Sequence, residues 1–328
     1  MPLHLEEFQG EEFLGYVENV PQRKEDKLQR FLPDDTVYDT EFTYNIINGS
    51  YGKMASITAW DSGAPLRDKE TLERMTAELG KVQHSYRLTE KELLMFNRPR
   101  AASEKDKAIE QVYNQTDRLV WGVYDRAKWF RAKAVYSGAL TFSENGVDLD
   151  VDFGIPEENK LVPDTAWDNA GASPLRDIQT AVQQFKDQNN GDLPEVIHMN
   201  GTTESLMLQH DDVKAQIFGT ANTSRITTPE HLQGLLSSLS LPPYEVNDDR
   251  VQGDNGMEKL IPDNRLVLLG DDLGNLMYGI TVEKNYEPGI YVIPEIQETN
   301  PPRQTVFVGA SMFPALQRTS AIVYLDVL

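Results

Sequence analysis

Apolar and small side chains recur at every third or fourth position in one long stretch of the chain, from residue 104 to residue 137. Charged residues occupy the positions between them, which is the pattern of a helix that buries one face and exposes the other. Ser103 precedes the stretch as a possible N-cap, and Gly138 follows it as a stop. The pattern predicts one helix over residues 104–137, roughly 50 Å long at 1.5 Å per residue. The residues expected on its buried face are Ile109, Val112, Thr116, Leu119, Val123, Ala127, Phe130 and Ala134.

Alternating apolar and polar residues predict strands on both sides of a polar segment that precedes this helix. Residues 39–49 form one β-rich run, and residues 82–88 alternate between the two kinds of side chain. Between them, the polar residues 61–71 have few apolar neighbours against which they could bury. We therefore predict a long two-stranded excursion whose tip gains order by lying on another surface. After the helix, residues 139–153 predict a hairpin that turns at an Asn-Gly pair.

A second lobe follows a connector rich in proline and glycine, residues 156–174. Its clearest helix has Ser173 as N-cap and Pro174 in the first turn, and it stops at Gly191. Further helices and strands are predicted for "PEVIHMNG", "TTESLMLQH", "TPEHLQGLLSSL", "YEV", "RLVLLG" and "LMYGITV", which together predict an α+β lobe. The chain closes with "GIYVIPEIQE", "RQTVFVGASMFPALQRT" and "SAIVYLDVL", whose β-branched residues predict one terminal antiparallel sheet. Residues 1–38 are too sparse in apolar side chains for a core of their own, and we predict an extended arm.

The charge balance restricts the classes of function that remain. With 52 Asp and Glu against 31 Lys and Arg, the chain of 328 residues carries a formal net charge of −21, which repels nucleic-acid backbones and anionic membranes. It contains no cysteine, so disulfides, thiolate catalysis and cysteine metal sites are excluded. The start lacks the features of a signal peptide, and no run approaches the ~18 apolar residues of a membrane span. We therefore expect a protein that folds in the cytosol by packing alone.

No motif in the sequence is specific for catalysis, a cofactor or a metal. His210 with Asp211 and Asp212 fits a polar helix end better than a metal site. The stretch "GDDLGN" at 270–275 lacks the phosphate-loop and calcium-loop patterns, and Ser311 lacks the G-x-S-x-G pattern of a nucleophile elbow. We therefore predict that the protein is not an enzyme and that it needs neither a cofactor nor a metal.

The order of the predicted parts resembles the major capsid proteins of tailed bacteriophages with the Hong Kong 97-type fold. An arm, a two-stranded loop, a long helix, an α+β lobe and a returning C-terminal sheet follow one another as they do in those proteins. The likeness is greatest to the lambda-type major capsid protein E family. It covers most of the chain and depends on the joint order of three stretches: "ITAWDSGAPLRDKETLERMTAELGKVQHSYRLTEKELL", "IEQVYNQTDRLVWGVYDRAKWFRAKAVYSGAL" and "QTVFVGASMFPALQRTSAIVYLDVL".

The resemblance implies an α+β fold with defined parts. They are an N-terminal arm (1–38), a P-domain strand (39–49), an extended loop or E-loop (50–86), a P-domain segment (87–159) with spine helix 104–137 and hairpin 139–153, an A-domain (160–285) and a P-domain C-terminal sheet (286–328). In this family the E-loop reaches over a neighbouring subunit, which would explain the polar loop tip. The residues that this likeness places in the inter-subunit loop are Trp60, Asp61, Arg67, Asp68, Lys69, Glu70, Glu73 and Arg74.

The implied function is structural, as a major capsid protein that assembles in the host bacterial cytoplasm. It would form hexamers and pentamers of an icosahedral virion shell around phage double-stranded DNA. The implied partners are further copies of the chain, a separate scaffolding protein, a portal and possible decoration protein, and DNA only non-specifically. Some members cross-link a loop lysine to an asparagine of another subunit, but no asparagine stands out as a partner for Lys69, and we expect no cross-link. Two alternatives stay open: an encapsulin-type nanocompartment shell, and a cytosolic hydrolase that uses Asp and Arg groups.

Overall fold

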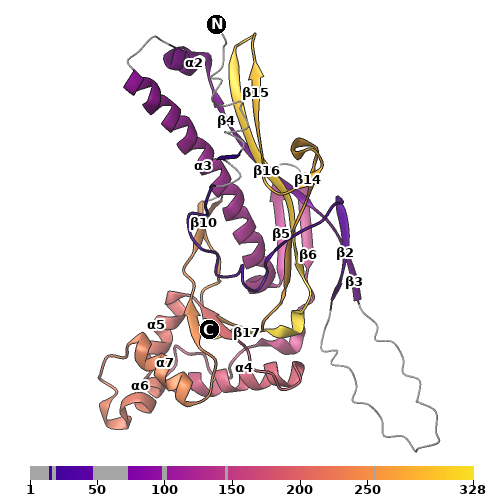
Figure 1. Ribbon diagram of the computed structural model, residues 1–328. Helices are drawn as coiled ribbons and strands as arrows, with labels where there is room; N and C mark the ends of the chain where they lie inside the picture. Colours follow the sequence, from indigo (N-terminus) through magenta and orange to yellow (C-terminus); the bar gives the residue numbers. More distant parts are fainter. Residues whose placement is uncertain (1–14, 17–19, 47–72, 98–101, 145–146, 254–255) are drawn as a thin grey trace, which may run out of the picture.

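The computed structural model describes residues 15–16, 20–46, 73–97, 102–144, 147–253 and 256–328. Two β-sheets and one long helix organise these residues (Figure 1). In the view of Figure 1, the long helix and the larger sheet form the upper part of the molecule, and the smaller sheet with its helices lies below them. Among the described residues, no helix is both long and apolar enough to cross a membrane.

Strand β16 (Arg303–Leu316) is the centre of the larger, six-stranded sheet, because it is long enough to pair with three other strands. These antiparallel neighbours are β4 (Gly80–Leu88), β13 (Gly274–Thr281) and β15 (Tyr291–Gln297). The short strands β1 (Asp34–Thr36) and β14 (Glu287–Pro288) both pair with β13. Almost all of β16 is buried, which accounts for its nearly continuous run of apolar and small residues.

Helix α3 (Ala102–Ala132) packs against β16 and β4 of this sheet. Its continuation η2 (Lys133–Ser137) is a π-helical turn, so the helix predicted over residues 104–137 changes its hydrogen-bond pattern before it ends. The chain then reverses at Gly138, which has a left-handed φ of 69°. A Cβ at this position would also lie 3.1 Å from the Tyr324 hydroxyl, so both the backbone and the available space favour glycine. We call α3 together with η2 the spine helix.

The smaller sheet has five strands in the order β7, β17, β12, β8 and β9. Their bounds are β7 (Lys160–Leu161), β17 (Ile322–Asp326), β12 (Arg265–Leu269), β8 (Val196–Met199) and β9 (Tyr244–Val246). The helices of this lobe are α4 (Pro174–Gln188), α5 (Gly201–Gln209), α6 (Asp211–Phe218) and α7 (Pro229–Ser238). Short helical turns are η3 (Glu157–Asn159), η4 (Thr220–Asn222), η5 (Val282–Lys284) and η6 (Thr319–Ala321).

The last strand does not join the single C-terminal sheet that the sequence predicts over residues 286–328. Strand β17 pairs with β12 and β7 in the smaller sheet, whereas β15 and β16 belong to the larger one. Likewise, β13 joins the larger sheet, although the sequence assigns residues up to 285 to the second lobe. β-branched residues indicate that a segment is a strand, but they carry no information on its partner. The prediction is therefore wrong for β17.

Further antiparallel pairs lie outside the two larger sheets. They are β2 (Glu41–Ile46) with β3 (Glu73–Glu78), β5 (Ala139–Glu144) with β6 (Val147–Asp152), and β10 (Arg250–Gly253) with β11 (Gly256–Lys259). Strands β5 and β6 occupy the hairpin predicted over 139–153, and their connection 145–146 lies outside the described residues. The sequence predicts that the E-loop extends to residue 86, but β4 already pairs with β16 in the larger sheet from Gly80 onward. Helix α2 (Glu90–Asn97) follows β4.

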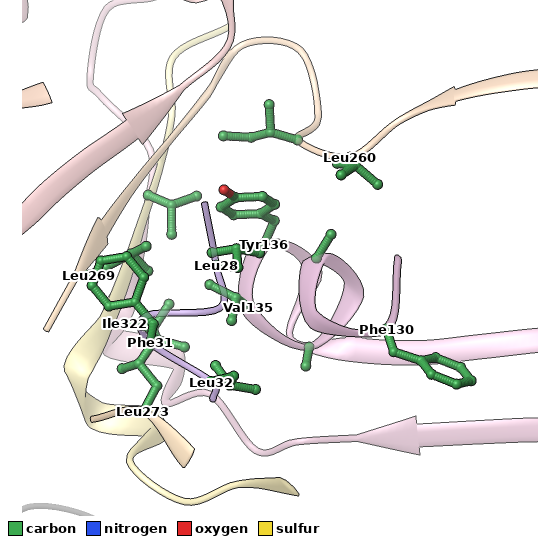
Figure 2. Packing of buried hydrophobic residues seen from close by; sticks show 14 of the residues in the cluster. Leu28, Phe31, Leu32, Phe130, Val135, Tyr136, Leu260, Leu269, Leu273 and Ile322 are labelled. Atoms are coloured by element: carbon green, nitrogen blue, oxygen red, sulfur yellow. The ribbon is translucent and has the colours of Figure 1, made fainter. Parts of the chain in front are cut away.

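The N-terminal segment, which we define as residues 20–36, is not the extended arm that its sparse apolar pattern predicts. Leu28 and Phe31 are buried in the same cluster as Leu273 and Ile322 (Figure 2). Leu273 directly precedes β13 of the larger sheet, and Ile322 begins β17 of the smaller sheet. Fully burying one such side chain contributes about 1.5–3 kcal/mol. The segment is therefore part of the core that joins the two lobes.

Candidate functional site: the loop base, the spine helix and the lobe junction

The pair of strands β2 and β3 forms the base of the predicted loop and has one buried face. Phe42 and Tyr44 of β2 and Ala77 of β3 are buried. The ring of Phe42 lies 6.2 Å from the ring of Phe313 in β16, measured between centroids. The opposite face exposes Glu41, Thr43, Asn45, Arg74, Thr76 and Glu78. The base is thus fixed to its own subunit by one face and presents a polar surface on the other.

Leu79 fixes the end of this base in a notch of the larger sheet. Its backbone N–H donates to the carbonyl oxygen of Thr40 at 3.1 Å, and its side chain is buried. The notch exists because β13 has glycine at position 279, where a Cβ would lie only 2.1 Å from Leu79 Cδ1. Any larger residue than Gly279 must therefore displace Leu79.

We expect Gly279→Ala to lower the free energy of unfolding by about 1–3 kcal/mol, because the added methyl group overpacks the notch. In combination with Leu79→Ala the total loss should be smaller than the sum of the single losses, since the shorter side chain leaves room for the methyl group. Urea unfolding followed by circular dichroism measures all three variants. Gly234→Ala is the matched control, because a Cβ at that position in α7 would have no atom within 4 Å. Strictly additive losses at positions 79 and 279 would contradict the notch.

Only two of the eight predicted loop residues belong to the described part of the chain. Glu73 and Arg74 begin β3, where their backbones pair with Ile46 and Asn45 of β2, and the side chain of Arg74 is exposed. The remaining six lie outside the described residues: Trp60, Asp61, Arg67, Asp68, Lys69 and Glu70. Their role in a contact between subunits stays a prediction.

The predicted packing residues of the spine helix face the larger sheet and its surroundings where they are described. Val123 and Phe130 are buried, and Leu119 is partly buried against the same core. The ring of Phe130 lies 5.6 Å from that of Trp129 and 6.4 Å from that of Phe142 in β5. Two further predicted residues, Ile109 and Val112, belong to α3, and their side chains are outside the described part.

His84 holds strand β4 against the spine helix. Its Nε2 lies 2.6 Å from the carbonyl oxygen of Leu119, so this nitrogen donates the hydrogen bond. The ring can approach so closely because the helix has Gly122 at this point, where a Cβ would lie 2.4 Å from His84 Cε1. A glycine inside a helix costs about 0.5–1 kcal/mol relative to alanine, and the close approach of His84 explains its presence here.

The N-terminal segment crosses from the spine helix to the smaller sheet. On the helix, Trp121 Nε1 donates to the carbonyl oxygen of Pro21 at 3.1 Å. At the sheet, Arg30 forms an ion pair with Glu245 of β9 at 2.9 Å. A cavity of about 400 Å³ lies between the segment, the helix and residues 248–250. The segment therefore contacts both lobes and borders the space between them.

One carboxylate, that of Asp249, connects three parts of this junction. It pairs with Lys24 of the N-terminal segment and lies 3.3 Å from the Nζ of Lys128 in the spine helix. Burial alone would raise the pKa of Asp249, but its contacts with the two lysines are stronger and lower it. The carboxylate therefore stays charged and attracts both lysines at neutral pH.

Arg131 ties the N-terminal segment to the end of the spine helix, and only 2% of its side chain is exposed. Its Nη1 donates to Asp26 at 2.9 Å, and its Nε donates to the carbonyl oxygen of Leu32 at 2.8 Å. Its Nη2 contacts Asp34. Burial raises the pKa of Asp34, although the Arg131 guanidinium acts in the opposite direction. Among the described residues, the hydrogen-bond partners of this buried cation thus all come from one segment.

A buried polar chain joins the π-helical turn to the smaller sheet. Asn247 Nδ2 donates to the Tyr136 hydroxyl at 2.9 Å, and this hydroxyl lies 2.7 Å from Nδ1 of His198. Because the hydroxyl receives the amide hydrogen, its own hydrogen points to Nδ1, which places the proton of neutral His198 on Nε2. Burial, and then the charges of Arg30 and Lys27, lower the pKa of His198 to about 3. The ring is therefore neutral at neutral pH.

The residues that the sequence offered as candidates for catalysis or metal binding have structural roles in the fold. His210 is the N-cap of α6 and accepts the backbone N–H of Asp212 at 3.2 Å. Ser311 is buried in β16, opposite Gly279 of β13. Residues 270–275 lead from β12 into β13. Within the described ranges, no group of three His, Asp or Glu side chains is arranged to hold a metal ion.

Two polar residues of the lobe junction, Arg131 and His198, were not predicted from the sequence, although the sequence holds a signal for each of them. Arg131 lies four residues after Ala127 and three before Ala134, on the apolar stripe of the helix, where a charge indicates a buried ion pair. His198 lies within "PEVIHMNG", which the sequence predicts as a buried strand, so its ring had to be buried as well. Both positions conflict with the pattern around them, and such conflicts often mark residues with a specific role.

A family model described as phage major capsid protein E matches residues 11–327 of the chain. No curated protein matches this chain by sequence. Among solved structures, a protein assigned as a prophage capsid protein of E. coli CFT073 gives a TM-score of 0.64 at 13% identity, over 97% of this chain and 98% of that one. A phage-related protein from Bordetella bronchiseptica RB50 gives 0.53 at 10% identity, over 95% and 94%. The capsid of an empty GTA particle gives 0.52 at 14% identity, over 97% and 98%.

The structural likenesses show a capsid fold of the Hong Kong 97 type, in agreement with the resemblance found in the sequence. The family model extends over nearly the whole chain, including the loop base, the spine helix and both lobes. This protein therefore belongs to the phage major capsid protein E family.

Proposed function

We propose that this chain assembles as hexamers and pentamers into an icosahedral shell that encloses phage double-stranded DNA. Its family makes it a major capsid protein, which is a structural and non-enzymatic component of the virion capsid and self-assembles into a shell. The hydrolase alternative is therefore wrong, and the encapsulin-type shell, which shares the fold, is not favoured.

We assign the domains by strand pairing. The larger sheet, the spine helix and the hairpin β5–β6 make up the P-domain, and the smaller sheet with its helices makes up the A-domain. Strand β17 then belongs to the A-domain and β13 to the P-domain, so the chain passes between the two domains more than once. The E-loop consists of the base β2–β3 and residues 47–72.

The observation that supports a contact between subunits is the loop base. Phe42 and Leu79 fix this base to its own sheet, and the charged face of the base is exposed. Acidic and basic residues are interspersed in the sequence from Asp61 to Arg74. Exposed ion pairs contribute only ~0.2–1 kcal/mol each, so they select the register of a contact more than they provide affinity. The affinity comes from repeating the same contact around a closed shell.

The test of this clasp replaces residues 61–70 by a Gly-Ser linker of the same length. We expect the far-UV circular dichroism spectrum and the melting temperature of the subunit to remain those of the wild type, because the base and the core are retained. Sedimentation velocity should show small oligomers instead of shells. A variant with residues 61–70 in scrambled order keeps length and composition and should also fail, since the register of charges is lost. Normal shells from the linker variant would contradict the clasp.

The remaining partners follow from the same assignment. A scaffolding protein, a portal and possible decoration protein of the same phage would contact the shell, which would assemble in the host bacterial cytoplasm. With a net charge of −21 the protein repels DNA on average, so its contacts with a packaged genome are expected to be non-specific.

A further inference from the structure

We propose that His198 couples the opening of one joint in the subunit to the uptake of one proton. The joint is the contact of the π-helical turn η2 with strands β8 and β9 and with the N-terminal segment. It connects the spine helix to the smaller sheet, so its opening would loosen the two lobes without breaking either sheet.

The side chain of His198 lies where these elements meet. Its ring centroid is 5.9 Å from that of Tyr136 in η2 and 5.7 Å from that of Phe31 in the N-terminal segment. Its Nε2 is 3.7 Å from Glu245 Oε2 of β9, beyond hydrogen-bond distance. The ring is fully buried, and Nε2 has no hydrogen-bond partner within the described structure. An unsatisfied buried donor in a native core requires an explanation.

The closed joint cannot easily accept a proton on this ring. Nδ1 receives the hydrogen of the Tyr136 hydroxyl, and Asn247 already donates to the same hydroxyl. A proton on Nδ1 would force the hydroxyl to accept two hydrogens, and its own hydrogen would need a new acceptor inside the core. In the open joint, water surrounds the ring, and its pKa returns to about 6.5.

The charged groups around His198 come from the N-terminal segment and from β9. Arg30 and Lys27 disfavour a positive ring, whereas Glu245 favours one but is already paired with Arg30 at 2.9 Å. Burial is the largest effect, and the combined result is a pKa of about 3. The closed state therefore binds one proton fewer than the open state between pH 3 and about 6.5, so each pH unit of acidification in this range favours opening about tenfold.

The first measurement uses the wild-type, unassembled subunit with ¹⁵N-labelled histidine. Long-range ¹H–¹⁵N spectra distinguish the neutral tautomers from the imidazolium cation. At pH 5 we expect one histidine to be neutral with its proton on Nε2, and Tyr136→Phe should shift its signal because the hydroxyl contacts its Nδ1. A charged ring for this residue at pH 5 in the folded subunit would overturn the proposal.

The second measurement is hydrogen exchange, corrected for intrinsic rates, at pH 7 and pH 5. The amides of Phe31 and Leu32, which both donate to the carbonyl oxygen of Leu28 in the N-terminal segment, report on the joint, and amides between β15 and β16 report on the larger sheet. We expect on the order of 30-fold more opening at the joint at pH 5 than at pH 7, and a smaller change in the larger sheet. His198→Gln should remove this pH dependence.

His231→Gln is the matched control for the loss of a titrating ring. His231 lies at the third position of α7 in a capping box with Thr228, where glutamine retains the reciprocal hydrogen bonds. The control should respond to pH as the wild type does. An equal pH dependence in His198→Gln, or none at the joint in the wild type, would contradict the proposal.

Discussion

Replacement of Arg131 by alanine should lower the free energy of unfolding by about 3–5 kcal/mol, a large part of the stability of a typical domain. The guanidinium is 2% exposed and forms hydrogen bonds with Asp26 at 2.9 Å and with the carbonyl oxygen of Leu32 at 2.8 Å. Without it, the Asp26 carboxylate, whose side chain is 5% exposed, becomes a buried charge with no cation beside it. Most of the lost stability thus comes from leaving the Asp26 carboxylate buried without a cation, and less of it from the ion pair itself.

A second variant separates these two contributions. Arg131→Met together with Asp26→Asn removes both charges, keeps a similar volume and should recover most of the loss. Arg30→Ala is the matched control, because its ion pair with Glu245 is 44% and 38% exposed and should be worth less than ~1 kcal/mol. Urea unfolding at pH 7, followed by circular dichroism, compares the variants. Similar losses for Arg131→Ala and Arg30→Ala would show that Arg131 does not act as a buried cation.

The spine helix and the hairpin β5–β6 could be predicted from the sequence because their signals are local. The helix shows its apolar stripe directly, with buried Val123, Ala127 and Phe130 at the expected spacing. The hairpin has alternating strands around an Asn-Gly pair. In both cases the residues that determine the element lie within the element, so no knowledge of distant partners is needed.

The membership of strands in sheets could not be predicted in the same way. The stretch "SAIVYLDVL" is a strand by composition, but its partners β12 and β7 come from distant parts of the chain. Nothing in the residues of this stretch indicates that it pairs with β12 and β7 and not with β16, the preceding strand. Pairing depends on loop closure and on the packing of both faces, which are properties of the whole fold.

The candidate site likewise has some features that follow from local sequence and others that depend on distant segments. The absence of a catalytic motif and the polar character of the loop follow from residue types alone. The lobe junction does not, because Lys128 looks like a member of a solvated charged face, and the charge of Arg131 on the apolar stripe does not identify its partners in the N-terminal segment. The burial of such a charge is established only when its partners are known, and the partners of Arg131 lie about a hundred residues earlier in the chain.

Replacement of Phe31 by alanine should cost about 3–5 kcal/mol, although the sequence places this residue in an arm without a core of its own. The ring is 1% exposed and belongs to the same buried cluster as Leu269 and Ile322 of the smaller sheet (Figure 2). It also meets the ring of His198 edge-on, with centroids 5.7 Å apart. Its removal would leave a cavity between the two lobes, where neither sheet can move in to fill it without disturbing the other.

Tyr38→Ala is the matched control, because this aromatic residue lies just after the same segment and is 73% exposed. Its loss should change the free energy of unfolding by no more than ~0.5 kcal/mol. Thermal and urea unfolding of the unassembled subunit measure both variants independently of shell formation. If residues 20–36 were a detachable arm, Phe31→Ala and Tyr38→Ala would unfold at the same urea concentration as the wild type. A large loss for Phe31→Ala alone would show that the segment closes the core between the lobes.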